Sequence, residues 1–391
     1  MDYAEFFEEV TDYRVAGRCL HELSDILLLV LCGLLADCET FEDIYDYACD
    51  KEVTLREFMD LPAGIPSHDT LNRVFRHLVP TELERCLCQW GQEIVALLAG
   101  RHLIIDGKQL RGTTPAGQRQ AQVQLVSVWA AEQRVRLAQT AVEAKRNELV
   151  AIPQVLDLVE VRGSVVTLDA MGCQRAVAAK LVARGADYVL ALKQNQGELH
   201  RQVAVHFAPL LPQPPAHQRR DKDHGRGELR QVWVSQQWGL VDAGVDWPGL
   251  QTLVCQQTTR WVAGKVQQAT RYFLSSLAGA SAATLAGYVR GHWGIENQQH
   301  WHLDVTFAED ASQCRRDHAP RNRSTMRKLA LTLLRRLPLV MSLKRKRKKA
   351  ARDDKFLLQL LAQLPVVSSG YLLTGIRQGP RSDFPAGLFP C

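Results

Sequence analysis

The chain has 391 residues, of which 46% are hydrophobic and 23% are charged. This composition is that of a folded protein with room for two or three domains, and it excludes disorder over most of the chain. The ten Cys show no regular spacing, which predicts reduced thiols and a cytoplasmic protein rather than a disulfide framework. The longest apolar run, Ile26 to Ala36, falls well short of the roughly 20 residues that a membrane span needs, so it predicts a buried helix.

Positive charge is concentrated near the C-terminus. The formal net charge is +6, but the segment from Arg315 to Arg352 holds fifteen Lys or Arg against one acid, Asp317. Its densest part runs from Lys344 to Lys349. Such a block is the electrostatic footprint expected for a phosphate backbone, and the alternative is a solvated helical face or tail.

The first 98 residues predict an all-helical domain. Its apolar-periodic segments are Leu23–Leu35, Phe41–Ala48, Leu55–Met59 and Leu83–Leu98. Ser67 or Asp69 is the candidate N-cap of a further helix that carries Arg73 and Arg76. Two short helices that meet at a turn resemble a helix-turn-helix, so this domain is a candidate for the recognition of DNA ends.

Two short apolar runs each end at one acid. The run before Asp106 stops at an Asp-Gly turn signal, and the run before Asp169 repeats this design. The intervening segments predict two alternating strands and one helix, at Gln122–Ala130, Arg134–Val142 and Ile152–Val159. A three-strand meander, a helix and a fourth strand beside the first would bring the two Asp together, which is the α/β order of a ribonuclease H-like fold.

The chain after Asp169 predicts a helix over Arg175–Arg184 and a strand over Tyr188–Leu192. The strand leads to the polar run Lys193 to Gln196, which would lie at the same sheet edge as the acids. These residues either contact phosphate or cap the strand.

A long insertion then separates Asp169 from the next acidic motif. Strand-like alternation recurs in it at Leu229–Gln236, Thr252–Thr259 and Ala269–Leu277, which predicts a β-rich subdomain. The turn around Arg226 offers basic groups, although a plain hairpin with a charged tip has the same pattern.

The stretch Tyr288 to Asp304 gathers ionisable groups on one face if it forms a helix. At about 100° per residue, roughly one third of the circumference carries Trp293, Glu296, Asn297, His300 and Asp304. Converging carboxylates, imidazole and amide groups favour a site over simple packing, the alternative being a half-buried helix whose His and Trp find hydrogen-bond partners. Two acids on strand ends and one on a helix can hold a pair of hard divalent cations.

Either Glu296 or Asp304 could be that third acid. Eight residues at about 1.5 Å each place them roughly 12 Å apart, too far for both to hold ions about 4 Å apart. The residue left out, which we expect to be Asp304, would cap the helix or pair with the basic segment.

Long motifs in this chain resemble one family. They are IDGKQLRGT at Asp106, LDAMGCQ and YVLALKQNQ after it, DHGRGELR in the insertion, and RGHWGIENQQHWHLDVTFAED at Glu296. Over nearly the whole chain they resemble the DDE transposases of bacterial insertion sequences, of the H-repeat-associated (ISAs) type. The Tyr-Arg-Glu-Lys pattern of better-known relatives is not kept, because His292 and Leu303 stand four before and seven after Glu296.

This resemblance implies a ribonuclease H-like core that cleaves transposon-end DNA and joins it to target DNA. Asp106, Asp169 and Glu296 would be both catalytic and metal-holding residues, with two Mg²⁺ per site and Mn²⁺ as a substitute. Expected partners are the inverted-repeat ends, target DNA and a second copy in a homodimer on paired ends, without a membrane, in a nucleoid-associated protein. The candidate DNA contacts are Lys108, Arg111, Lys193, Asn195, Arg226, Arg290, His292, Trp293, Asn297 and His300.

The expected organisation has five parts. They are a helical domain at 1–98, a core in two pieces at 99–200 and 279–337, the β-rich insertion at 201–278, and a basic segment with a tail at 338–391. Two other functions use the same features: a ribonuclease H-like nuclease or resolvase without strand transfer, and a domesticated DNA-binding protein that no longer cuts.

Overall fold

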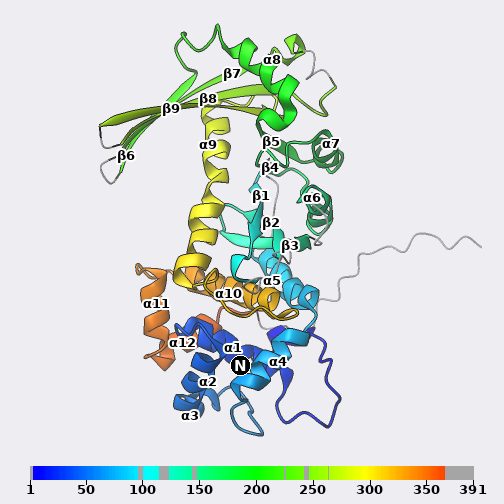
Figure 1. Cartoon of the computed structure of the whole chain (residues 1–391), viewed down its shortest axis with the longest axis vertical. Helices are drawn as coiled ribbons and strands as arrows, with labels where there is room; N and C mark the ends of the chain where they lie inside the picture. The colour runs from blue at the N-terminus through cyan, green and yellow to red at the C-terminus, as the bar shows by residue number, and fades with distance from the viewer. Residues whose placement is uncertain are drawn as a thin grey trace, which may run out of the picture.

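The structure is a computed structural model, and it describes residues 3–95, 100–113, 123–142, 148–223, 226–241, 246–262 and 264–365. Figure 1 shows a layer of helices at one end of the molecule, the core strands in the middle and the strands β6 to β9 at the other end. The long helix α9 runs along the core strands and links the two ends.

Nine strands in the described part of the chain form one sheet in the order β3-β2-β1-β4-β5-β9-β8-β7-β6. Its first five are β1 (His102–Gln109), β2 (Gln124–Ala130), β3 (Val135–Val142), β4 (Val165–Leu168) and β5 (Asp187–Leu192). The strands β1, β2 and β3 form an antiparallel meander, and β4 and β5 continue parallel to β1. This arrangement confirms the ribonuclease H-like order predicted from the sequence.

The two faces of these strands are covered by different helices. On one face, Leu103 and Ile105 share a core with α6 (Glu148–Asp157) and α7 (Arg175–Ala183). On the other face, Val165 and Val189 pack with α9 (Ala282–His292). Because both faces are buried, the parallel strands are continuous apolar runs rather than alternating ones.

The insertion is β-rich, as predicted, but its strands extend the core sheet. Helix α8 (Gly197–Phe207) precedes β6 (His217–Asp223), β7 (Arg226–Ser235), β8 (Thr252–Val262) and β9 (Lys265–Ser275). The last of these pairs antiparallel with β5, with Val189 opposite Ser275. The insertion thereby covers the edge that β5 would otherwise leave unpaired. Strand β6 was not predicted, because its residues are charged on both faces.

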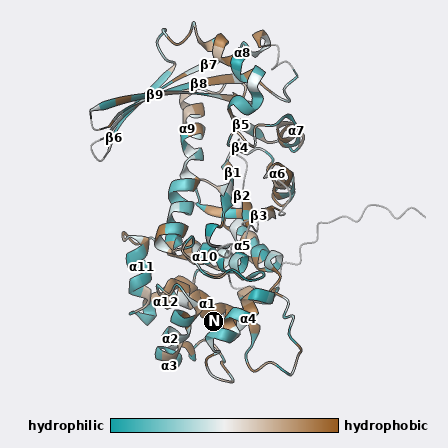
Figure 2. Cartoon of the chain, in the orientation of Figure 1, coloured by the Kyte–Doolittle hydropathy of each residue, from teal (hydrophilic) through white to brown (hydrophobic). Residues whose placement is uncertain are grey.

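The helical layer contains α1 (Leu23–Leu35), α2 (Phe41–Asp50), α3 (Glu52–Leu55), α4 (His68–His77) and α5 (Pro80–Ile94). Helix α1 is buried almost throughout, as predicted, and it is among the most hydrophobic segments in Figure 2. The N-cap of α4 is Ser67, whose hydroxyl accepts from the Thr70 N–H. The expected helix over Leu55–Met59 is instead the end of α3 and a turn. Short 3-10 helices lie at Ala4–Phe7, Arg111–Thr113, Gln194–Gln196 and Trp238–Leu240.

Three C-terminal helices join this layer, namely α10 (Ala319–Arg336), α11 (Leu343–Ala350) and α12 (Asp354–Leu361). None of the helices in the described ranges has the length and apolar character needed to cross a bilayer.

The basic segment is neither a solvated tail nor a uniformly exposed phosphate footprint. Lys346 and Arg347 are buried in α11, and Arg347 donates to the Leu34 carbonyl oxygen and pairs with Asp37 at 2.9 Å. Several cations of α10 are buried as well, namely Arg323, Arg327 and Lys328. Charge density along the sequence did not reveal that these side chains satisfy backbone carbonyls and carboxylates inside the helical layer.

Helix α5 connects the helical layer to the sheet. A Cβ at Gly91 would lie 1.9 Å from the Arg136 carbonyl oxygen of β3, so only Gly permits this close approach. Next to this contact the buried Glu84 accepts from Gln139 at 2.6 Å and from both ends of the Arg321 guanidinium at 2.7 and 2.6 Å.

Candidate active site

The two predicted aspartates lie on neighbouring parallel strands. In the β1–β4 pairing Ile105 is opposite Leu168, so Asp106 lies within β1 at the level where β4 ends and Asp169 begins the chain after it. Asp106 is 19% exposed, whereas Asp169 is more open and accepts from the Gly172 N–H at 3.2 Å. The sequence prediction that the first strand stops at Asp106 is therefore wrong, because Gly107 to Gln109 continue the pairing with β2 instead of turning.

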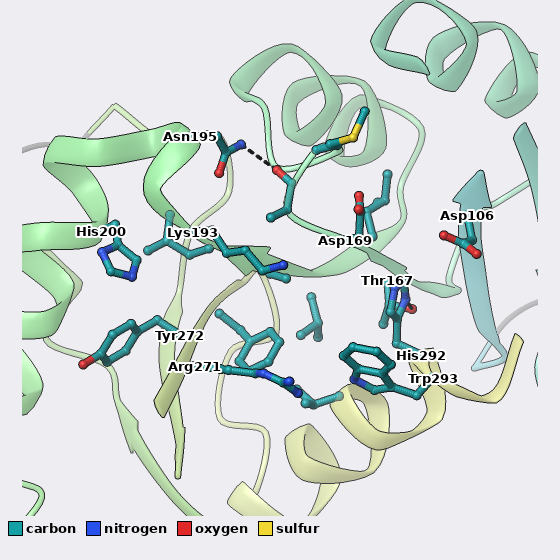
Figure 3. A pocket seen from close by; sticks show the side chains of 18 of the residues that line it. Asp106, Thr167, Asp169, Lys193, Asn195, His200, Arg271, Tyr272, His292 and Trp293 are labelled. Atoms are coloured by element: carbon teal, nitrogen blue, oxygen red, sulfur yellow. Dashed lines mark hydrogen bonds between the residues drawn. The ribbon is translucent and has the colours of Figure 1, made fainter. Parts of the chain in front are cut away.

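These aspartates open into a cavity of about 830 Å³, which Glu296 also lines. Figure 3 shows Asp106, Asp169, His292 and Trp293 towards one end of this cavity and His200 and Tyr272 towards the other, with the side chains of Lys193 and Arg271 reaching in between. Three acids from distant parts of the chain thus face one cavity.

The segment that carries Glu296 is not a regular α-helix. Helix α9 ends at His292, and the chain continues as π-helical segments at Glu296–His300 and His302–Thr306. The Phe307 N–H donates to the His302 carbonyl oxygen at 3.1 Å, five residues back. The single face predicted at 100° per residue is therefore wrong, because a π-helix turns less per residue than an α-helix.

This winding separates the residues of the predicted face. Trp293 and Glu296 line the cavity, and Asn297 is exposed outside it. His300 and Asp304 instead contact β1, since His300 Nδ1 is 3.5 Å from Asp106 Oδ2 and Asp304 Oδ1 is 2.6 Å from Lys108 Nζ.

Lys108 is not an open phosphate contact. Its side chain is 9% exposed and lies between Asp304 and the buried Glu309, whose carboxylate is 3.6 Å away. Asp304 accordingly pairs with β1 and not with the basic segment, contrary to our expectation. Burial raises the pKa of Asp304, and the hydrogen bond from Lys108 opposes that shift.

Three imidazoles lie near the site, of which His102 is buried and His292 and His300 are half-buried. Thr167 Oγ1 lies 2.9 Å from His102 Nε2 and 2.9 Å from His292 Nδ1, so one hydroxyl joins two rings. Burial lowers the pKa of His102 and of His292 to about 4. Burial and the neighbouring cations, Lys108 first among them, lower the pKa of His300 to about 3. These three rings are therefore neutral near pH 7, and none offers a positive charge to a phosphate.

The buried histidines predict acid sensitivity of the fold. The pKa of His102 falls from 6.5 to about 4 on burial, so between these values the unfolded chain binds a proton that the folded chain refuses. Stability therefore rises with pH through this window and is lost as the pH falls. In His102→Gln, the slope of the unfolding free energy between pH 4.5 and 6 should decrease by up to about 1.4 kcal/mol per pH unit. Urea titrations at several pH values measure this slope, and an unchanged slope would contradict the assignment.

The other predicted contacts are dispersed. Lys193 and Asn195 both line the cavity, and the Asn195 amide also donates to the Ala170 carbonyl oxygen at 2.6 Å and so caps the chain after β4. Arg290 is exposed outside the cavity lining, and Arg111 is 75% exposed, with its Nε 3.9 Å from Asp310. Arg226 begins β7, and its side chain lies outside the described part of the structure.

Sequence reasoning missed several residues of the cavity, namely Thr167, His200, Arg271 and Tyr272. Arg271 lies over the Trp293 ring at 5.0 Å and thereby joins β9 to the end of α9. The pairing of β9 with β5 brings this Arg to the site, and strand alternation alone does not predict such a distant pairing. Thr167 was accessible in principle, because it stands two residues before Asp169 on the same strand.

The three acids fit a hard divalent cation in their chemistry, since all offer carboxylate oxygens. Within the described ranges, however, no three His, Cys, Asp or Glu side chains lie close enough to form a complete ligand cluster. Glu296 is exposed on the cavity wall.

Comparisons with known proteins identify the family of this chain. A family model described as "Transposase DDE domain" matches residues 98–333, and one described as "DDE_Tnp_1-associated" matches residues 4–91. The chain is 34% identical over 366 residues to "Putative transposase YncI" of Escherichia coli O157:H7, covering 92% of this chain and 94% of the relative. It is 32% identical over 368 residues to "H repeat-associated putative transposase YhhI" of Escherichia coli K12, covering 92% and 97%. A protein of Xanthobacter autotrophicus, named only by its position in the dhlA 3' region, is 39% identical over 277 residues, covering 69% and 93%.

Proposed function

We propose that this chain, which belongs to the transposase DDE domain family, binds the ends of an insertion sequence, cuts them and joins them to target DNA. The observation that carries the proposal is the convergence of Asp106, Asp169 and Glu296 on one cavity. These are also the acids that the family resemblance assigns to catalysis.

The proposed chemistry assigns a role to each acid. Asp106 and Asp169 would hold divalent cations, two Mg²⁺ or Mn²⁺, from the neighbouring strands β1 and β4, and Glu296 would complete the oxygen ligands from the cavity wall. When bound, such ions polarise a phosphodiester and lower the pKa of the attacking hydroxyl. Lys193, on the wall of the same cavity, would hold a phosphate oxygen of the bound strand.

The neighbouring residues would leave the acids available to cations and would hold the DNA strand. Because His292 and His300 are neutral near pH 7, they do not compete with metal cations for the carboxylates. Arg271 and Trp293, in contact at the cavity mouth, are suited to hold the DNA strand beside the site.

Strand transfer is the test of this function. The probe is a duplex that carries an inverted repeat bordering the coding region, incubated with the full chain, Mg²⁺ and a supercoiled plasmid. A transposase should cut at the repeat and join its 3′-hydroxyl to the plasmid. Specific cutting without joined product would support the ribonuclease H-like nuclease or resolvase, and binding without cutting would support a domesticated DNA-binding protein.

The exposed cations of α11 should contribute DNA contacts without sequence preference. Lys344, Arg345 and Lys348 are exposed, whereas their neighbours are buried, so a truncation before Lys344 would remove part of the helical core as well. The triple change of these three residues to Gln should weaken binding to all duplexes. It should also reduce the salt slope of log K by about one unit per lost phosphate contact. Fluorescence anisotropy at several salt concentrations measures this slope, and an unchanged slope would make the surface a merely solvated face.

A further inference from the structure

Three side chains of β1 contact three side chains of the chain that follows α9. Alternate strand residues face the same side of a sheet, so Ile104, Asp106 and Lys108 form one row. The successive pairs are Ile104 with Ile295 in one buried cluster, Asp106 with His300 at 3.5 Å, and Lys108 with Asp304 at 2.6 Å. This row of three contacts, which we call the register ladder, connects the strand of the first acid to the segment of the third.

The ladder depends on the π-helical winding. Its steps along the helical segment are five residues, from Ile295 to His300, and four residues, from His300 to Asp304. In an α-helix, at about 100° per residue, these steps rotate the side chains by about 140° and 40°, which would turn Asp304 away from β1. With hydrogen bonds to the fifth residue, a π-helix has roughly four to five residues per turn, so the same steps return to one face.

A π-helical segment is uncommon and needs tertiary contacts to hold it. Of the three pairs in the ladder, Lys108 with Asp304 is the closest polar contact, and Lys108 also lies 3.6 Å from Glu309. Removing the ammonium would take away the cation that pairs with Asp304, while Glu309 would keep the neighbouring Lys328 and Arg327. Loss of the pair with Asp304 would allow the segment to rewind towards the α-helical register. Rewinding would rotate Glu296 relative to the two aspartates.

We propose that Lys108 is a positioning residue, which holds Glu296 in register with Asp106 and Asp169 through its ion pair with Asp304. This inference rests on the proposed function for its catalytic consequence, but not for its structural one. Lys108 itself lies outside the cavity lining and does not touch the reacting groups.

Lys108→Met and Asp304→Ala test the proposal, because each removes one charge of the pair. Amide hydrogen exchange over residues 296–306 should become at least about 10-fold faster in both. Mn²⁺ binding, followed by electron paramagnetic resonance of the free ion, should weaken by about 10- to 100-fold, as should cleavage of the end duplex at saturating DNA. The double variant should bind Mn²⁺ and cleave no more weakly than the more impaired of the two single variants, because both changes break the same ion pair.

A matched control pair lies in the helical layer. Lys51 Nζ is 2.7 Å from Asp354 Oδ1, and that Asp is 35% exposed, against 31% for Asp304. Lys51→Met should lower the melting temperature without changing Mn²⁺ binding or the exchange of residues 296–306. If Lys51→Met and Lys108→Met alter Mn²⁺ binding equally at equal loss of stability, Lys108 is only a structural ion pair.

Unchanged exchange over 296–306 in Lys108→Met would overturn the proposal, whatever the cleavage result. Lys108→Arg provides a second check, because a retained charge should restore Mn²⁺ binding if the protein folds. Failure of the proposed function can be distinguished from failure of this inference. If the proposed function is wrong, the wild-type chain will neither cut the end duplex nor bind Mn²⁺. The exchange experiment would still decide whether the register ladder holds the segment.

Discussion

Asp106→Asn and Asp169→Asn are each expected to reduce metal-dependent cleavage of the end duplex by about 10³-fold or more. The change preserves side-chain size and removes the charge that would hold a cation. Binding of the end duplex should remain nearly unchanged, because neither carboxylate attracts a phosphate in the absence of metal. Cleavage is measured with labelled duplex in Mg²⁺ and binding by anisotropy in Ca²⁺.

The two variants also have to remain folded. Asp169 is exposed and accepts a hydrogen bond from the Gly172 N–H at 3.2 Å, which the side-chain oxygen of an Asn can keep. Ser127, which is opposite Asp106 on β2 and buried, supplies a nearby control for changes in the strands. Ser127→Ala should leave cleavage intact. Parallel loss of cleavage, end binding and melting temperature in Asp106→Asn would give this residue a folding role instead.

Those parts of the fold that depend on local patterns could be predicted from the sequence. The strand that carries Asp106, the meander and the buried helix α1 each follow from hydrophobic periodicity, and their order predicted the pairing of β1 with β4. The Asp-Gly pair was misleading as a turn signal, because β1 continues through it to Gln109. The continuation of the sheet from β5 into β9 could not be predicted in this way. These two strands are far apart in the chain, and they pair because β9 covers the edge of β5 that would otherwise lack hydrogen-bond partners. No local sequence pattern indicates which distant strand will do so.

Positive charge in the sequence was the least reliable guide to which side chains are exposed. In the sequence nothing distinguishes Lys108, Lys346 and Arg347 from Lys and Arg that contact phosphate. In the structure all three are buried against carboxylates or carbonyl oxygens. A buried cation needs partners from several elements, which only the tertiary structure identifies. The positions that remain open to DNA are therefore the exposed ones, such as Lys344 and Arg111.

The helical pattern around Glu296 led to the correct cavity but to an incorrect face. An α-helical period groups His300 and Asp304 with Glu296, whereas π-helical winding directs both of them to β1. The α-helical period of about 100° per residue does not apply to this segment, because its contacts with β1 override the local preference for an α-helix. The identity of the third acid accordingly rests on which carboxylate faces the cavity, and this is Glu296.

Glu296→Gln is therefore expected to eliminate Mg²⁺- and Mn²⁺-dependent cleavage, with a loss as large as that of the aspartate variants. Its side chain is exposed, so the melting temperature should change little. Asp304→Asn should lower the melting temperature and reduce cleavage only partly, because the amide can still accept from Lys108 but no longer carries the charge that balances it. Cleavage assays in both metals and thermal unfolding of the two variants separate these effects. A stable but inert Asp304→Asn beside a Glu296→Gln that still cuts would exchange the roles of the two acids.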